Sequence, residues 1–305
     1  MFMKDRTPKV SIGLPVYNGG KFIEETIKNV LSQDYKDYEL IISDNASTDN
    51  TRDICHQFVE KDKRIQYFLN SQNFGLPFNY KQAFDLSKGE YFKWISADDK
   101  MDPGYLSRCV KVLDQDKSVV LVCTKVCFID ESGNIISEKR TDWNLQSNDA
   151  TERLRFVILQ GGHWADADAI TGLIRSSSLV KTRFLPAYQG GDRRPLGELC
   201  LLGKFFQIKM PLYYQRLHPN ASSYNTGNIE WMLEFFKDKG VGVFFPTLCL
   251  CADHFRTVWN SDLKVINRLK STVNILKLIY WARMHVYGEI RLTSRYLINR
   301  SISGH

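Results

Sequence analysis

The chain has 305 residues, of which 43% are hydrophobic and 25% charged, a composition typical of a globular protein with a sizeable core. Its net charge of +7 is uneven, because residues 261–305 hold eight Lys or Arg against two acids. Its seven cysteines lack zinc-site spacing, so we expect buried reduced thiols rather than metal ligands or disulfides. The sequence also lacks the run of roughly 20 apolar residues of a spanning helix, and residues 1–9 lack the apolar run of a secretory signal.

Strands and helices alternate along the first third of the chain. Strands are predicted at 10–14, 38–43, 64–69 and 91–95, and helices at 21–32, 47–60 and 77–87. Pro15 is expected to end the first strand, and the nearly continuous apolar run at 38–43 is typical of a strand covered on both faces. This order predicts an α/β fold with a parallel sheet flanked by helices.

The alternation loosens after Pro103. Further strands are predicted at 119–126, 169–175 and 205–215, and helices at 103–113, 149–159 and 196–204. The turn at 131–134 predicts a hairpin. The charge composition changes near Asn260, where the basic tail begins.

Two adjacent carboxylates, Asp98 and Asp99, follow the strand at 91–95. In open α/β sheets, ligands bind at the carboxyl ends of the strands. Mg²⁺ prefers one or two protein carboxylates together with phosphate oxygens, so this pair indicates a cation site that also grips a diphosphate. The same acids would also suit the start of a helix, and this alternative stays open.

Several separated motifs now stand in one order along the chain. They are Pro15-Val16-Tyr17-Asn18, Asp44-Asn45-Ala46-Ser47, Asn73-Phe74-Gly75, Ser96-Ala97-Asp98-Asp99, Gly190-Gly191-Asp192 and Arg216-Leu217-His218-Pro219. Over residues 9–223 the chain therefore resembles an inverting family 2 glycosyltransferase. The resemblance implies a GT-A fold, with a Rossmann-like, mostly parallel central sheet flanked by helices. It implies a catalytic domain at 1–225, with a nucleotide-sugar half at about 1–102 and an acceptor half at about 103–225. A helical, basic C-terminal extension would follow at 226–305.

The resemblance assigns nucleotide-sugar binding to Pro15, Tyr17, Asn18, Asp44, Asn73, Lys81 and Asp98. A carboxylate at a strand end, such as that of Asp44, accepts N–H or hydroxyl donors from a nucleoside. Asp44 would also suit the capping of a turn. Lys81 would offset diphosphate charge or simply be an exposed helix lysine.

The resemblance also implies a Mn²⁺ or Mg²⁺ cofactor held by Asp99, Asp98 and His218, with Asp99 preferred for direct ligation. Ser96 stands where the family usually has an acid, so the site would rely on the two remaining carboxylates. A histidine before a proline, such as His218, is also often structural.

The proposed general base is Asp192, which would take the proton of the acceptor hydroxyl. Its alternative is a helix N-cap after the glycine turn. Arg216 would hold an acceptor or phosphate anion, and His163 and Trp164 fall in the expected acceptor region. The implied reaction moves a sugar from a nucleotide-diphosphate sugar, with a UDP-sugar favoured, to a saccharide or lipid-linked saccharide. The implied setting is bacterial surface polysaccharide or lipopolysaccharide synthesis.

Other functions fit less well. A dinucleotide-dependent dehydrogenase needs a Gly-x-Gly-x-x-Gly loop, which residues 14–20 do not supply. The same loop lacks the basic residues of a nucleotidyltransferase. A catalytically inactive nucleotide-sugar-binding or membrane scaffold protein stays open, because Ser96 replaces an acid.

The basic tail at 261–305 mixes Lys and Arg with apolar and aromatic residues, as in helices that lie on an anionic membrane. A helix packed on the catalytic domain and a homodimer contact are the alternatives. The tail has no nucleic-acid reader motif, so no nucleic-acid partner is expected. We expect a cytoplasmic protein, peripheral at the inner membrane if the tail docks there.

Overall fold

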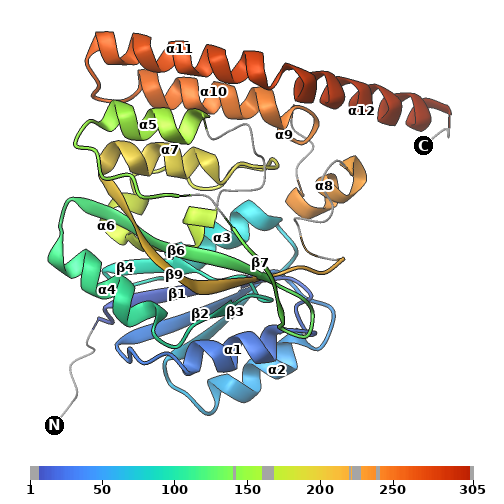
Figure 1. The fold of residues 1–305 in the computed structure, drawn as a ribbon. Coiled ribbons are helices and arrows are strands. Elements are labelled where there is room, and N and C mark those ends of the chain that lie inside the picture. The colour runs from blue at the N-terminus through green and yellow to red at the C-terminus, as the bar shows by residue number, and fades with distance from the viewer. Residues whose placement is uncertain are drawn as a thin grey trace.

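The computed structural model describes residues 7–139, 142–159, 168–219, 221, 228–237 and 241–302. A central sheet lies between two helical layers (Figure 1). Its strands are β1 (Val10–Val16), β2 (Tyr38–Asp44), β3 (Ile65–Leu69), β4 (Tyr91–Trp94), β5 (Lys100–Met101), β6 (Val119–Ile129), β7 (Ile135–Glu138), β8 (Leu173–Arg175) and β9 (Lys204–Arg216). Their order is β3-β2-β1-β4-β8-β6-β9-β5, and β7 pairs with β6.

The first half of the sheet is parallel, as the sequence predicts. β1 pairs in parallel with β2 and β4, and β2 pairs with β3. Every residue of β1 and β2 is buried, which explains their apolar sequences.

The first strand continues through Pro15, where the sequence predicts its end. Gly13 accepts the N–H of Ile95 from the β4 side, and Pro15, two residues later, faces the same side. β4 stops pairing with β1 at Trp94. The missing N–H of Pro15 is therefore not needed there.

The second half of the sheet is mixed. β8 runs antiparallel to both β4 and β6, and β5 runs antiparallel to β9, whereas β6 and β9 are parallel. The strand predicted at 169–175 is shorter, because Asp168–Thr171 forms a 3₁₀ turn before β8. The predicted hairpin is confirmed, since β6 and β7 pair antiparallel around the turn.

Helices cover both faces of the sheet. They are α1 (Ile23–Leu31), α2 (Thr51–Val59), α3 (Leu76–Asp85), α4 (Tyr105–Gln115), α5 (Ala150–Leu159), α6 (Ser176–Leu179), α7 (Arg193–Leu202), α8 (Ile229–Phe236), α9 (Val241–Phe244), α10 (Pro246–Trp259), α11 (Val265–Trp281) and α12 (Arg283–Ile302). Residues of α1, α2 and α4 share one hydrophobic core with the sheet. Residues of α3, α5, α7, α10 and α11 form a second core on the other face.

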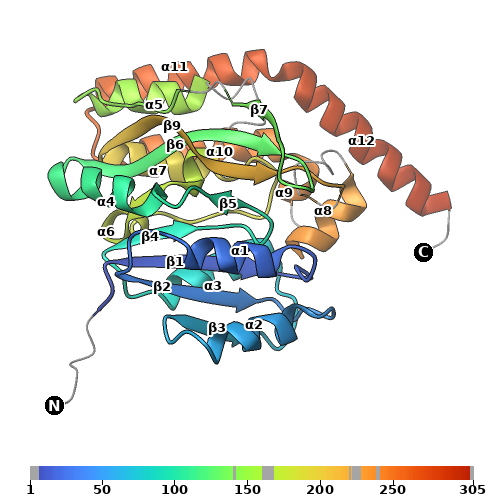
Figure 2. The ribbon, with the colours of Figure 1, turned by 60° about the horizontal axis from the view of Figure 1, so that its bottom comes forward.

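The C-terminal helices add a further layer. α10 packs over α7, and α11 packs over α5 (Figure 1). α12 continues past the body of the molecule in both views (Figures 1 and 2). Within the described residues, none of the helices combines the length and the apolar character needed to cross a bilayer.

Candidate active site

The loops that follow β1 and β2 meet at the carboxyl edge of the sheet. Val16 and Asp44, the last residues of these strands, lie opposite each other. The Asn18 N–H donates to Ser47 Oγ at 2.8 Å, and the Thr48 N–H donates to Asn18 Oδ1 at 2.8 Å. Asn18 has a φ of +51°, a left-handed conformation that asparagine tolerates. These bonds fix one loop against the other.

Asp44 is fully buried at this edge. Its Oδ1 accepts the Ser47 N–H at 2.8 Å, and its Oδ2 accepts the Tyr67 hydroxyl at 2.6 Å. Burial, and then the Asp44 carboxylate, raise the pKa of Tyr67. Asp44 therefore does stabilise a turn, while each carboxylate oxygen keeps a second lone pair for a ligand donor.

A second loop, at 73–75, joins the same edge. Asn45 Nδ2 donates to Asn73 Oδ1 at 2.7 Å, and Asn73 Oδ1 also accepts the Gly75 N–H at 2.9 Å. Gly75 has a φ of +86°, and a Cβ there would lie 2.2 Å from the Phe236 carbonyl oxygen. Only glycine fits this position, so the loop is held tightly against α8.

Three other predicted nucleotide-sugar residues differ in their surroundings. Pro15 is buried in β1, and Tyr17 is 45% exposed just beyond it. Lys81 lies on α3, where its Nζ is 2.7 Å from Asp85 Oδ1, one helical turn away. Lys81 thus takes part in an exposed ion pair on its own helix.

The turn that carries Asp98 and Asp99 is fixed by α1. Thr26 Oγ1 donates to the carbonyl oxygens of Ala97, at 2.9 Å, and of Asp99, at 3.1 Å. The Asp99 N–H points back to the Ser96 carbonyl at 3.3 Å. The two carboxylates therefore project from a turn whose backbone is anchored.

The two carboxylates meet different surroundings. Asp98 has a side chain that is 25% exposed, and its Oδ2 lies 2.8 Å from His218 Nε2. Asp99 is buried, with Oδ2 accepting the Tyr213 hydroxyl at 2.7 Å and Oδ1 accepting the Arg216 N–H at 2.9 Å. Burial, and next the charge of Asp98, raise the pKa of Asp99 to about 7. Asp98 is therefore the accessible acid, and Asp99 secures the end of β9.

Arg216 is a buried clamp. Its guanidinium donates to the carbonyl oxygens of Asp98 at 2.8 Å, Asp130 at 3.1 Å and Glu131 at 2.6 Å. It also pairs with Glu25 Oε2 at 2.6 Å. These contacts direct the side chain to protein acceptors from α1, the carboxylate turn and the β6–β7 hairpin.

Lys93 is a buried residue that the sequence analysis missed. Its Nζ contacts the Thr171 carbonyl, lies 3.3 Å from the Tyr105 hydroxyl and lies 4.4 Å from the centre of the Tyr213 ring. Burial lowers the pKa of Lys93 to about 7. The signal was a lysine within a strand predicted from its aromatic residues, because a charge there must find buried partners.

Asp192 occupies the N-cap position of α7, yet in the described part of the chain its side chain makes no capping hydrogen bond. Its carboxylate is therefore not used to cap the helix. Burial raises the pKa of Asp192. The preceding turn needs its glycines, since Gly190 has a φ of +74° and a Cβ on Gly191 would lie 2.4 Å from Pro186 Cγ.

Tyr80 relates these acids to one another. Burial raises the pKa of Tyr80, and the charges of Asp98, Asp99 and Asp192 raise it further, whereas a hydrogen bond from Ser96 lowers it. The phenol therefore lies within electrostatic range of both the carboxylate turn and Asp192. Ser96 faces this phenol instead of supplying a third acid.

The acceptor region is only partly described. His163 and Trp164 lie outside the described residues. Nearby Asp168 Oδ1 accepts the indole N–H of the buried Trp143 at 3.2 Å. Among the described residues, three or more His, Cys, Asp or Glu side chains are nowhere grouped to hold a metal.

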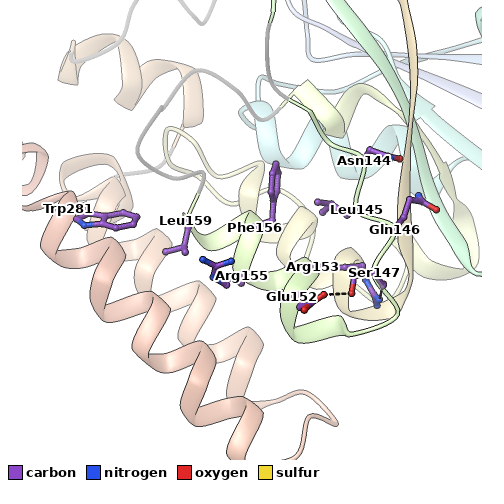
Figure 3. A pocket seen from close by; sticks show the side chains of 10 residues that line it. All are labelled: Asn144, Leu145, Gln146, Ser147, Glu152, Arg153, Arg155, Phe156, Leu159 and Trp281. Carbon is purple, nitrogen blue, oxygen red and sulfur yellow. Dashed lines mark hydrogen bonds between the residues drawn. The ribbon is translucent and has the colours of Figure 1, made fainter.

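A pocket of about 640 Å³ lies away from the carboxyl edge (Figure 3). It is formed by the segment at 144–147, by α5 and by Trp281 at the end of α11. None of the predicted site residues lines it. The candidate site is therefore the carboxyl edge, not this pocket.

Comparisons with known proteins agree with this site. Residues 11–174 match the family model "Glycosyl transferase family 2", and the chain belongs to this family. It is therefore a glycosyltransferase.

Two relatives illustrate the similarity. An uncharacterised glycosyltransferase of Nostoc sp. is 34% identical over 69% of this chain and 65% of its own length. The GalNAc(5)-diNAcBac-PP-undecaprenol beta-1,3-glucosyltransferase of Campylobacter jejuni is 33% identical over 43% of this chain. The chain spans 42% of the length of that enzyme and 46% of a Methanocaldococcus jannaschii relative.

Solved structures show the same fold. S. aureus TarS 1–349 in complex with UDP-GlcNAc aligns with 89% of this chain and 72% of its own, at a TM-score of 0.65 and 16% identity. A mannosyltransferase from Pyrobaculum calidifontis in complex with GDP-Man and Mn²⁺ aligns with 99% of this chain and 82% of its own, at a TM-score of 0.52 and 15% identity. The expected GT-A fold is thereby confirmed.

Proposed function

We propose that this protein transfers a sugar from a nucleotide-diphosphate sugar to an acceptor hydroxyl, with inversion at the anomeric carbon. The observation that carries the proposal is the Asp192 carboxylate, which is buried, not used for helix capping and within electrostatic range of the phenol that also senses Asp98. A site with two separately held acids can assign one to the leaving group and the other to the acceptor.

Asp98 and His218 would hold a divalent cation. An accessible carboxylate beside an imidazole nitrogen, 2.8 Å apart, is a donor pair that suits Mn²⁺ better than Mg²⁺, which prefers oxygen ligands. When bound, the cation would neutralise the diphosphate as it leaves. Asp99, expected from the sequence to be the direct ligand, would instead position the end of β9, because both its oxygens already accept protein donors.

Asp192 would act as the general base. It would accept the proton of the acceptor hydroxyl while that oxygen attacks the anomeric carbon and the bond to the diphosphate breaks. A raised pKa suits this role, because a carboxylate of higher basicity takes up the proton more readily. The sugar would never be attached to the protein, and its configuration would invert once.

Asp44, Asn18, Tyr17 and Asn73 would line the nucleoside side of the site. The TarS complexes with UDP and UDP-GlcNAc support a UDP-sugar donor. The Campylobacter relative, whose name describes an undecaprenol-diphosphate-linked saccharide, supports a saccharide or lipid-linked acceptor in bacterial polysaccharide synthesis. Such a reaction would take place in the cytoplasm.

A second candidate is an inactive nucleotide-sugar-binding scaffold, and the observation in its favour is Ser96. To test both, the purified chain is incubated with Mn²⁺ and a panel of UDP-, GDP-, dTDP- and CMP-sugars, and released nucleotide is measured. We expect slow hydrolysis of one donor, reduced roughly 10²–10⁴-fold in Asp192→Asn. The same donor should still raise the melting temperature of the variant. Donor binding without turnover in the unaltered chain would instead favour the scaffold.

A further inference from the structure

The last three helices carry an exposed apolar surface on the side away from the sheet. On α10 and α11 its members are at least 38% exposed, and we call them the outer face: Leu248, Phe255, Trp259, Val265, Ile266, Leu269, Val273, Leu276 and Tyr280. Trp259 Nε1 donates to Thr272 Oγ1 at 3.2 Å, which joins the α10 part to the α11 part. The outer face is thus one continuous surface over two helices.

α11 is apolar on two opposite sides. One side holds Ile275 and Leu278, which are buried in the core against the body. The other side follows the spacing of three and four residues from Ile266 to Tyr280, and in the described part of the chain nothing covers it. A surface helix normally turns a polar side to water. An exposed apolar patch of this kind indicates an interaction site.

The charges around the outer face have one sign. Eight Lys or Arg lie between residues 264 and 300, and the only acid between residues 263 and 302 is Glu289. Glu289 Oε1 accepts both the N–H, at 3.1 Å, and the hydroxyl of Thr247, so its carboxylate is turned into the protein. Lys270 and Lys277 lie on α11 beside the apolar stripe. The partner must therefore be both apolar and anionic.

α12 extends this surface beyond the body (Figure 2). Met284, Tyr287 and Ile290 are exposed along it, whereas Thr293 is buried. Tyr296 packs on the cluster of α8 and α9, with ring centroids 6.1 Å from Phe244. One side of α12 is therefore held, and the remainder is open.

We propose that the outer face, together with the exposed side of α12, docks on the surface of an anionic lipid bilayer. Its apolar side chains would enter the headgroup boundary while Lys and Arg contact lipid phosphates. A second copy of the chain fits less well, because two surfaces with the same uncompensated positive charge repel each other.

Docking would bring the carboxyl edge close to the bilayer. Tyr296, Phe236 and Leu76 belong to one hydrophobic cluster, and Gly75 contacts the Phe236 carbonyl. The tail is thus separated from the loop at 73–75 by a single helix, α8. A lipid-linked acceptor would then meet the site without leaving the membrane, a point that rests on the proposed function, whereas docking itself does not.

The test is sedimentation of the full chain with vesicles of phosphatidylcholine, with and without phosphatidylglycerol. We expect binding to the anionic vesicles only, and weakening by added salt, because counterions screen exposed charges. Each base near the surface contributes about 1 kcal/mol, so Lys270→Glu with Lys277→Glu should weaken binding at least tenfold. Leu269→Ser with Leu276→Ser should weaken it as well.

A matched control reverses two exposed lysines elsewhere, Lys61→Glu with Lys63→Glu, just beyond α2 at the opposite end of the molecule (Figure 1). Equal losses in the control and in the tail variant would overturn the proposal, as would equal binding to neutral vesicles. A dimer in light scattering that Leu269→Ser with Leu276→Ser dissolves, without vesicle binding, would assign the outer face to a second copy. A donor-induced thermal shift retained in the tail variants would show that docking, not the transfer site, has changed.

Discussion

At the scale of single residues, Asp98 and Asp99 are neighbours in the chain with different tasks. One carboxylate faces an imidazole at the surface, and the other accepts two buried donors. A buried donor that loses its acceptor costs about 1–3 kcal/mol, whereas an exposed carboxylate costs little to remove. The pair therefore separates metal binding from stability.

We expect Asp99→Ala to lower the free energy of unfolding by about 2–5 kcal/mol without metal, because the Tyr213 hydroxyl and the Arg216 N–H lose their acceptor. Asp98→Ala should leave the melting temperature without metal nearly unchanged and abolish its rise on adding Mn²⁺ and donor. Both are read by thermal unfolding. A stable Asp99→Ala that has lost the Mn²⁺ response would return the direct ligand to Asp99.

At the scale of elements, α7 and α10 approach closely around a buried histidine. A Cβ on Gly197 would lie 3.3 Å from His254 Nδ1, and neither ring nitrogen has a hydrogen-bond partner among the described residues. Burial, followed by the charge of Arg193, lowers the pKa of His254 to about 4, although Asp253 opposes this shift. The imidazole between these helices is therefore neutral at pH 7.

The stability of this contact should depend on pH. The unfolded chain takes up the His254 proton near pH 6.5, and the folded chain does so only near pH 4. Stability is therefore complete above pH 6.5 and falls as the pH drops, by roughly 2 kcal/mol between pH 8 and pH 5. His254→Leu should flatten this part of the curve in chemical denaturation. If the variant loses as much stability as the unaltered chain, other groups cause the acid sensitivity.

The parallel half of the sheet could be predicted because each strand and its helix are local in sequence. β8 was harder to place, because a three-residue strand owes its position to antiparallel contacts with β4 and β6. Similarly, the sequence identifies Asp98, but not the role of Arg216 as a clamp. That role depends on Glu25, 191 positions away in the chain, and such distant pairs leave no local pattern.

At the scale of the whole molecule, the C-terminal helices differ in how they contribute to the fold. Ile275 and Leu278 of α11 belong to the hydrophobic core that includes α5 and α7. α12 contributes no residue to either core beside the sheet, and its Tyr296 joins only the small cluster around α8. The predicted extension at 226–305 thus combines a helix that completes the core with one that projects from it.

Two truncations should separate these contributions. A chain that ends after Ala282 keeps both cores beside the sheet, so we expect cooperative unfolding, a small loss of melting temperature and a retained donor response, but weaker vesicle binding. A chain that ends after Asn260 exposes the core around Cys251 and Val258 and loses Ile275 and Leu278. Each fully buried aliphatic side chain stabilises by about 1.5–3 kcal/mol, a large share of a typical domain's stability. We therefore expect this shorter chain to be unfolded or strongly destabilised in circular dichroism melts. Equal melting temperatures for the two truncations would mean that residues 7–259 fold independently and that α11, like α12, serves an external partner.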